Sequence, residues 1–194
     1  MSFQLISIWI IWTGALGLLV APRIKSPGLR WFAVIIIAVM GWVPVNDLAL
    51  AAYLRAYIGD LSITSCVLLT AALFETLGFQ KFVHVRSKQS LAACVVATAC
   101  IFYPMALGAT YIDPYQWGYQ PYYMLPALLS ITLASWFSQR HLLSLCISLA
   151  VLAYALKLGE SDNLWDYLID PALAIVCAVK LLTLRETTER RLFS

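Results

Sequence analysis

Charged residues are scarce in this sequence. Only 12% of its 194 residues are Asp, Glu, Lys or Arg, whereas 62% are hydrophobic. A soluble domain typically contains roughly 25% charged residues, and a chain of this length cannot bury so much apolar surface inside one globule. The composition therefore predicts an integral membrane protein, with the lipid bilayer surrounding most of the apolar surface.

The motifs of metal, nucleotide and disulfide chemistry are also missing. The five cysteines fall inside apolar segments without a Cys-x-x-Cys pair, which argues against a disulfide framework or a thiolate metal site. The two histidines lie apart from the acidic residues, and no P-loop, Rossmann glycine pattern or His-Glu-x-x-His motif occurs. We therefore expect no cofactor, no bound metal and no nucleic-acid partner.

What the sequence has instead is a series of long apolar runs. Seven of them have membrane-spanning length, which predicts an all-α polytopic protein with a single transmembrane domain over residues 1–194. The first run has neither a basic region before it nor a small-residue cleavage site after it, so we interpret it as a retained helix and not a signal peptide. The predicted spans are residues 3–20, 30–45, 61–79, 90–109, 121–138, 141–157 and 164–184.

The loops between these runs alternate in charge. Eleven of the thirteen Lys and Arg residues lie on one side, and the other two are Arg55 and Lys157. The positive-inside rule assigns the basic side to the cytoplasm, which predicts a bacterial-type inner-membrane protein with its N-terminus outside and its C-terminus inside. Most of the acidic residues lie on the outer side, namely Asp47, Asp60, Asp113, Glu160, Asp162, Asp166 and Asp170.

The stretch before the last apolar run concentrates these acids. If that stretch continues the last helix, Asp162, Asp166 and Asp170 stack along one face. The apolar part after Pro171 covers about 21 Å of helix, which is too short for a hydrocarbon core of about 30 Å. We therefore expect the span to begin at Leu164. The alternative is that Asp170 caps a new helix with Pro171 at its first position, which would break the acidic row.

A short helix at about residues 48–58 is predicted to lie at the membrane surface between the second and third spans. Asp47 is its expected N-cap and Gly59 its C-terminal stop, and Asp60 with Ser62 is expected to cap the next helix. The helix carries Arg55. This side chain either extends to water or pairs with Asp60 or the acidic row, where it could also hold a phosphate or carboxylate.

Glu75 is predicted to lie inside the third span, near its cytoplasmic end. An intramembrane acid is a candidate for function. The alternative is a plain ion pair with the nearby Lys81.

The leading functional hypothesis is an outward-facing site for a lipid-linked, cationic or sugar-like ligand, in a transporter-like or ligand-binding protein. Two other classes remain open: a non-catalytic subunit bound to a membrane-protein partner, and a membrane enzyme that acts on a lipid headgroup with an outer Asp as general base. The sequence does not decide whether the protein is an enzyme. Aromatic side chains in the outer loops would supply stacking surfaces. The predicted ligand-binding residues are Arg55, Asp60, Trp117, Asp162, Trp165, Asp166 and Asp170.

Overall fold

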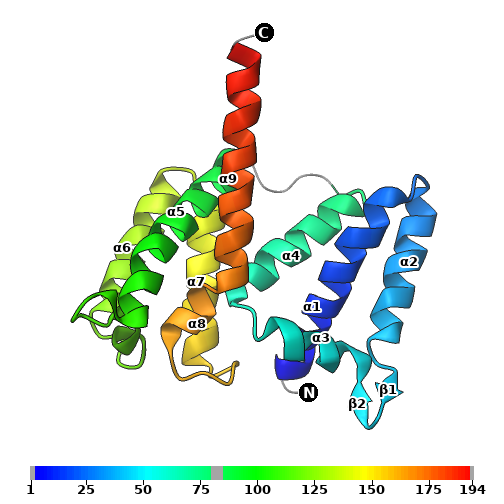
Figure 1. The fold of residues 1–194 in the computed structure, drawn as a ribbon, viewed down its shortest axis with the longest axis horizontal. Helices are drawn as coiled ribbons and strands as arrows, with labels where there is room; N and C mark the ends of the chain where they lie inside the picture. The colour runs from blue at the N-terminus through cyan, green and yellow to red at the C-terminus, as the bar shows by residue number, and fades with distance from the viewer. Residues whose placement is uncertain (1–2, 80–84, 193–194) are drawn as a thin grey trace.

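The described part of the chain, residues 3–79 and 85–192 of a computed structural model, consists of nine α-helices and one short β-hairpin (Figure 1). The predicted all-α class is confirmed. Three single turns of other helix types connect the larger elements: η1 (Ala21–Arg23), η2 (Met105–Ala109) and η3 (Pro114–Gly118).

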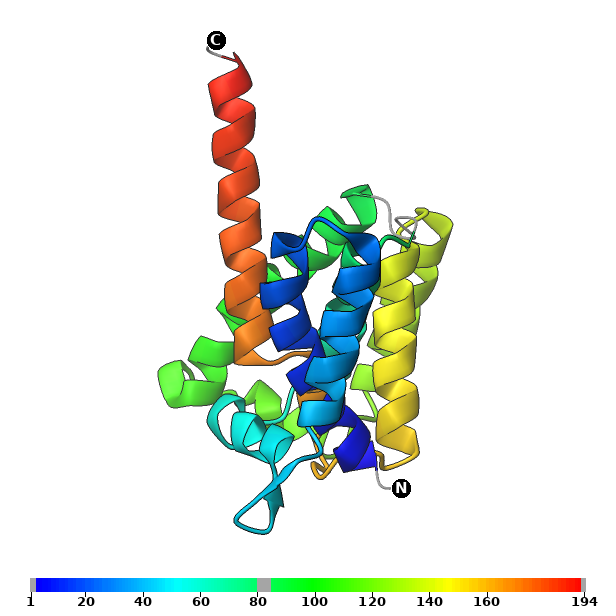
Figure 2. The same cartoon turned by 90° about the vertical axis from the view of Figure 1, so that its right-hand side faces the viewer.

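Seven of the nine helices have 14 or more residues, and successive ones run in opposite directions (Figures 1 and 2). Polar contacts identify the two ends of this arrangement. At one end the Arg30 guanidinium donates to the carbonyl of Thr76; at the other, Arg55 bonds to Glu160. The seven helices are α1 (Phe3–Val20), α2 (Pro27–Met40), α4 (Ile63–Thr76), α5 (Val85–Pro104), α6 (Met124–Phe137), α7 (His141–Ala155) and α9 (Pro171–Leu192).

The two remaining helices, α3 (Leu50–Ile58) and α8 (Leu164–Leu168), lie at the end where Arg55 meets Glu160. We call this the acidic end. α9 extends beyond the other helices at the opposite end (Figure 2).

The prediction of one continuous helix over residues 164–184 is wrong. Ile169 has an extended backbone (φ −145°, ψ 142°) that ends α8, and α9 starts afresh at Pro171. Asp170 caps α9, since its Oδ1 accepts from the Leu173 amide at 2.7 Å. Proline also disfavours a helical conformation for the residue before it. The alternative proposed from the sequence therefore applies, and Asp162, Asp166 and Asp170 do not form a row.

The segment between α2 and α3 also differs from expectation. Asp47 does not cap α3: with Asn46 it forms the turn of a β-hairpin, and both have positive φ (65° and 47°). The hairpin pairs β1 (Pro44–Val45) with β2 (Leu48–Ala49). Short polar side chains tolerate this left-handed conformation, so the Asn-Asp pair makes a turn in preference to a cap.

The expected end of α3 at Gly59 is confirmed, with a φ of 78° that favours glycine. Ser62 then caps α4, where its Oγ accepts from the Ser65 amide at 3.2 Å. Asp60 takes no part in that cap, because its carboxylate pairs with Arg55.

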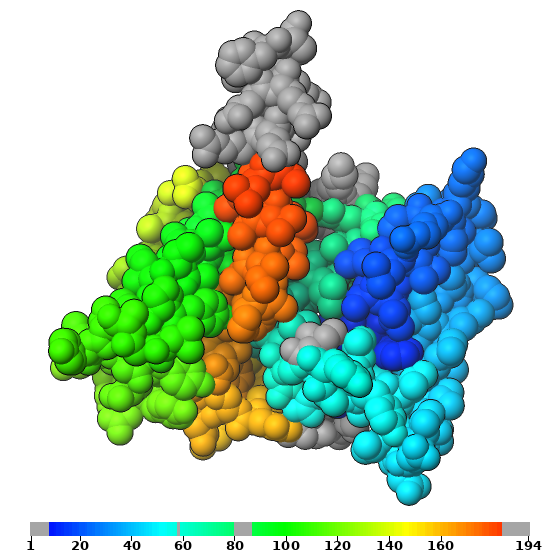
Figure 3. Space-filling model, in the orientation of Figure 1, coloured from blue at the N-terminus to red at the C-terminus, as the bar shows by residue number. Residues whose placement is uncertain are grey.

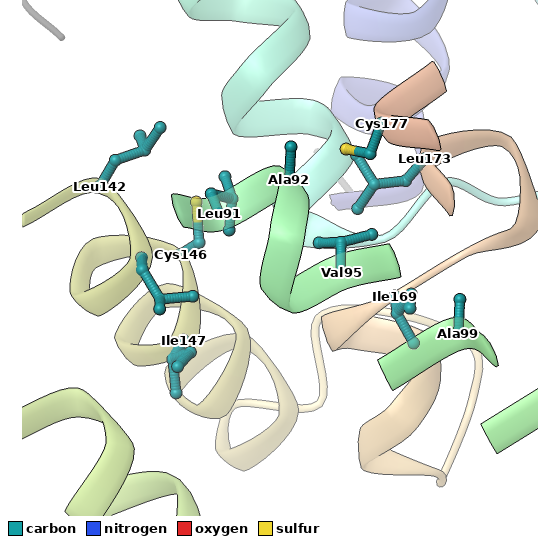
Figure 4. Packing of buried hydrophobic residues seen from close by; sticks show 11 residues of the cluster. Leu91, Ala92, Val95, Ala99, Leu142, Cys146, Ile147, Ile169, Leu173 and Cys177 are labelled. Atoms are coloured by element: carbon teal, nitrogen blue, oxygen red, sulfur yellow. The ribbon is translucent and has the colours of Figure 1, made fainter. Parts of the chain in front are cut away.

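The helices pack as two groups. α1 packs against α2, α3 and α4, whereas α5 packs against α7 and α9. α4 joins the groups through contacts with α7 and α8. The largest buried cluster belongs to the second group, where side chains of α5, α7 and α9 converge; Figure 4 shows Val95, Cys146 and Leu173 among them.

Two glycines of α1 allow α4 to approach closely. A Cβ at Gly14 would lie 2.5 Å from Cγ of Leu69, and one at Gly17 would lie 2.8 Å from Cδ1 of Leu73. Small residues at such positions are a common way for apolar helices to pack when lipid surrounds them.

Large apolar side chains cover the outer faces of the helices. Phe32 and Val39 on α2 and Leu129 on α6 are each about three-fifths exposed. Among the described residues, the helical segment Ser87–Ala109, with 23 residues, meets a length and hydropathy criterion for crossing a membrane, and six other apolar helices have 10–17 residues.

Candidate functional site

A cavity of about 480 Å³ opens at the acidic end. Three segments far apart in the sequence line it: the end of α3 with the start of α4, the end of α5 with η3, and the stretch from the end of α7 to the start of α9. Four predicted site residues line it together, Arg55, Asp60, Asp166 and Asp170. The other polar lining residues are Tyr103, Tyr115, Glu160, Ser161 and Tyr167.

Arg55 ties two sides of the cavity together. Its guanidinium forms a two-pronged contact with Asp60, in which Nη2 donates to Oδ2 at 2.7 Å, and the same nitrogen donates to Glu160 Oε1 at 2.9 Å. The Arg55 side chain is only 22% exposed. The hydrogen bonds, first to Asp60 and then to Glu160, raise the pKa of Arg55 above its ordinary value. Its positive charge is therefore permanent and already shared by two carboxylates.

Asp166 is held by neutral donors. The Tyr115 hydroxyl donates to its Oδ2 at 2.9 Å, and the Ser161 hydroxyl donates to the same oxygen at 2.6 Å. Burial, followed by the hydrogen bond to Asp166, raises the pKa of Tyr115, so the phenol remains a donor at neutral pH. These two donors position the carboxylate, and neither of them carries a positive charge.

Asp170 forms the inner wall of the cavity and is 6% exposed. Its Oδ2 accepts from the Ser62 amide at 2.9 Å, from the Ser62 hydroxyl at 2.7 Å and from the Ser65 hydroxyl at 2.5 Å. With the Leu173 amide on Oδ1, four donors surround one buried carboxyl group. Such a set offsets much of the cost of removing the group from water.

Aromatic rings form the remaining wall. Phe102 is buried at the end of α5 and Tyr103 follows it. The Tyr103 hydroxyl is buried and has no hydrogen-bond partner among the described residues. Tyr167 is fixed more firmly, because its hydroxyl accepts from the Gly159 amide and donates to the Ser161 carbonyl, both at 3.0 Å. Tyr103 thus leaves one polar atom that a ligand could satisfy.

The other predicted site residues lie outside the cavity lining. Trp165 packs against Phe102, with ring centroids 4.5 Å apart, and its Nε1 donates to the Pro114 carbonyl at 2.9 Å. Trp117 is 56% exposed. Asp162 faces Lys157 at 3.9 Å, and both side chains are more than four-fifths exposed, where such a pair contributes little to stability.

Glu75 lies at the opposite end of the molecule. It pairs with the Lys88 ammonium at the start of α5, with both oxygens 2.7 Å from Nζ. Its expected partner, Lys81, falls outside the described residues.

Several lining residues were not predicted as part of the site. Glu160 was recognised only as an outer acid, and Tyr115 and Tyr167 only as members of an aromatic-rich face. Tyr103 was not singled out and fell within the predicted span 90–109. Ser62 had a capping signal in the sequence, and Ser65 had no signal. Their contact with Asp170, more than a hundred residues away, had none.

The cavity carries an excess of negative charge. Four carboxylates and one guanidinium line it, and within the described ranges Asp166 and Asp170 take part in no ion pair. The same ranges contain no group of three or more His, Cys, Asp or Glu side chains placed to hold a metal ion. The arrangement suits an organic cation, because carboxylates attract its charge and aromatic faces add a cation–π contribution.

Comparisons of the chain with protein-family models, with curated proteins and with solved structures found no significant match. The functional interpretation therefore depends on the geometry of this cavity.

The position of η3 against α8 depends on one buried amide and yields a stability prediction. Asn163 is fully buried; its Nδ2 donates to the Tyr115 carbonyl, and its Oδ1 accepts from the Trp165 amide, both at 2.9 Å. Asn163→Ala should lower the free energy of unfolding by about 1–3 kcal/mol, because it leaves two partly buried backbone groups unpaired. The measurement is unfolding of the purified protein in detergent micelles, followed by tryptophan fluorescence.

The control for this substitution is Asp162→Ala, one residue earlier and exposed. It should change the free energy of unfolding by no more than about 0.5 kcal/mol. Equal effects of the two substitutions would contradict the role given to Asn163.

Proposed function

We propose that this chain is a multi-pass protein of the bacterial inner membrane whose outward-facing cavity binds an organic cation as the first step of transport or sensing. The observation that carries the proposal is the convergence of Asp60, Glu160, Asp166 and Asp170 with three tyrosines in a single cavity. The sequence suggested three ligand classes: lipid-linked, cationic and sugar-like. Of these, the excess of carboxylates attracts a cationic ligand most strongly. Sugar-like ligands would use the same hydroxyls and carboxylates as hydrogen-bond partners.

The membrane assignment is supported by the arrangement of apolar and charged side chains. Seven apolar helices alternate in direction, and exposed Phe, Leu, Ile and Val side chains cover their outer faces. Such a large exposed apolar surface would be an aggregation hazard in water. Arg30 and Lys88 lie at the end opposite the acidic cavity, which suits the positive-inside rule.

Helix length constrains the proposal. A helix of 14 residues rises about 21 Å, less than the hydrocarbon core of about 30 Å. The shorter helices must therefore complete their spans with apolar flanks, or the bilayer must thin around them. α2 has such a flank, since the exposed side chains of Trp42, Val43 and Val45 follow it.

The proposed topology predicts which loops reach the outside of the cell. Single cysteines introduced at Thr110, after η2, and at Ser138, after α6, are both at exposed positions. A membrane-impermeant maleimide applied to intact cells should label Thr110→Cys and should label Ser138→Cys only after permeabilisation. Wild-type cells provide the background from the native cysteines. The reverse pattern, or equal labelling of both positions, would contradict the orientation.

The proposed ligand class predicts an effect of cavity charge on binding. Propylammonium should bind the purified protein, as measured by isothermal titration calorimetry. Asp166→Asn should weaken this binding at least tenfold, because the substitution removes a carboxylate that forms no ion pair with any of the described residues.

The matched control is Asp162→Asn, which removes one negative charge four residues earlier, outside the cavity. It should change the affinity less than twofold. Absence of propylammonium binding to the wild-type protein, or an equal loss in both variants, would overturn the proposed ligand class.

A further inference from the structure

A second cavity of about 570 Å³ forms an apolar groove along the molecule. Figure 3 shows the hollow between α9 and α1, with α4 at its floor. Leu68 and Ala72 of α4, Leu173 and Val176 of α9, and Leu18 of α1 are among its lining residues. The groove follows α9 from Ala172 to Thr183, a rise of roughly 16 Å, about the length of a dodecyl chain.

The groove begins where the acidic cavity ends. Leu61 lines both of them. Asp170 and Pro171 line the cavity, and the next two residues of α9, Ala172 and Leu173, line the groove. Ser65 lines the groove while its hydroxyl bonds to Asp170. The polar cavity and the apolar groove therefore adjoin, and Leu61 and the residues around Asp170 lie where they meet.

We infer that the ligand is a membrane amphiphile with a primary ammonium headgroup, which lies in the cavity while its aliphatic chain lies in the groove. The inference rests on the proposed function and specifies the ligand. The ammonium is selected by charge, because carboxylates outnumber the guanidinium in the cavity and Asp166 forms no ion pair with a described residue. The N–H groups of a primary ammonium could also donate to the hydroxyl of Tyr103, which is buried and has no hydrogen-bond partner within the described part of the chain.

The far end of the groove favours this orientation over the reverse one. Lys88 and Lys180 lie there, so an ammonium at that end would meet like charges. An anionic headgroup could be attracted to that end, although the ammonium of Lys88 is already paired with Glu75. The two orientations therefore predict opposite headgroup preferences.

The experiment compares three probes on the purified full-length protein in uncharged detergent micelles at neutral pH. Propylammonium has the headgroup alone, dodecylammonium adds a long chain, and dodecanoate carries a chain of the same length with an anionic headgroup. Because each buried methylene adds to the hydrophobic driving force, dodecylammonium should bind at least tenfold more tightly than propylammonium and at least tenfold more tightly than dodecanoate.

Two variants on one helix test the groove itself. Val176 lines the groove and is 50% exposed, whereas Val179, also on α9, is 54% exposed and is not among the lining residues. Val176→Trp should lower the affinity for dodecylammonium to that for propylammonium and leave propylammonium binding unchanged. Val179→Trp adds the same bulk nearby and should change neither affinity.

The outcomes separate the inference from the proposed function. If propylammonium binds but dodecylammonium binds no more tightly, or if Val176→Trp leaves dodecylammonium binding unaffected, the inference fails and the proposed function stands. If dodecanoate binds as tightly as dodecylammonium, the assignment of an ammonium headgroup is wrong. If neither ammonium binds, the proposed function fails and the inference falls with it.

Discussion

The carboxyl group of Asp170 fixes the start of α9 to the start of α4. It accepts hydrogen bonds from the backbone and hydroxyl of Ser62, from the hydroxyl of Ser65 and from the amide of Leu173. A carboxyl group at 6% exposure would be costly without these donors. With them, the carboxyl group connects the two helix groups and fixes their relative orientation. Apolar contacts alone would not do so, because hydrogen bonds are directional and the hydrophobic effect is not.

The position of both cavities follows from this connection. Asp170 forms the inner wall of the acidic cavity, and the residues that follow it on α9 line the groove. The segment before it, which includes α8, carries Glu160 and Asp166, so fixing α9 also places these acids opposite Arg55 and Tyr115. A tilt of α9 relative to α4 would change the cavity and the groove together.

Sequence reasoning predicted the parts of the fold that depend on local physics. Apolar runs located the long helices, and Gly59 predicted the end of α3 because its φ suits glycine. The break between α8 and α9 was present in the sequence as a cap followed by proline, but the same residues also fit a continuous acidic helix. The length needed to cross a bilayer favoured one continuous helix, but in the structure Asp170 caps a new helix, α9. The prediction that Asp47 caps α3 was wrong for a similar reason, because an Asp side chain can stabilise either a helix cap or a turn.

The candidate site was only partly predictable, because its contacts are long-range. The excess of acids on one side pointed to Asp60, Asp166 and Asp170, and these do share a cavity. Nothing local to Trp165 distinguishes a stacking surface for a ligand from a ring that packs on Phe102. Likewise, Ser62 looked like an ordinary cap, and its second role depends on a residue more than a hundred positions away.

The central claim is that the carboxyl group of Asp170 holds α4 and α9 together through the Ser65 hydroxyl. A double-mutant cycle of Asp170→Asn and Ser65→Ala tests it most directly, with the free energy of unfolding of each variant measured in mixed micelles. The two side chains are in contact, so we expect each substitution to destabilise and a coupling energy of about 1 kcal/mol or more. Effects that add within about 0.3 kcal/mol would contradict the claim, because independent sites behave in that way.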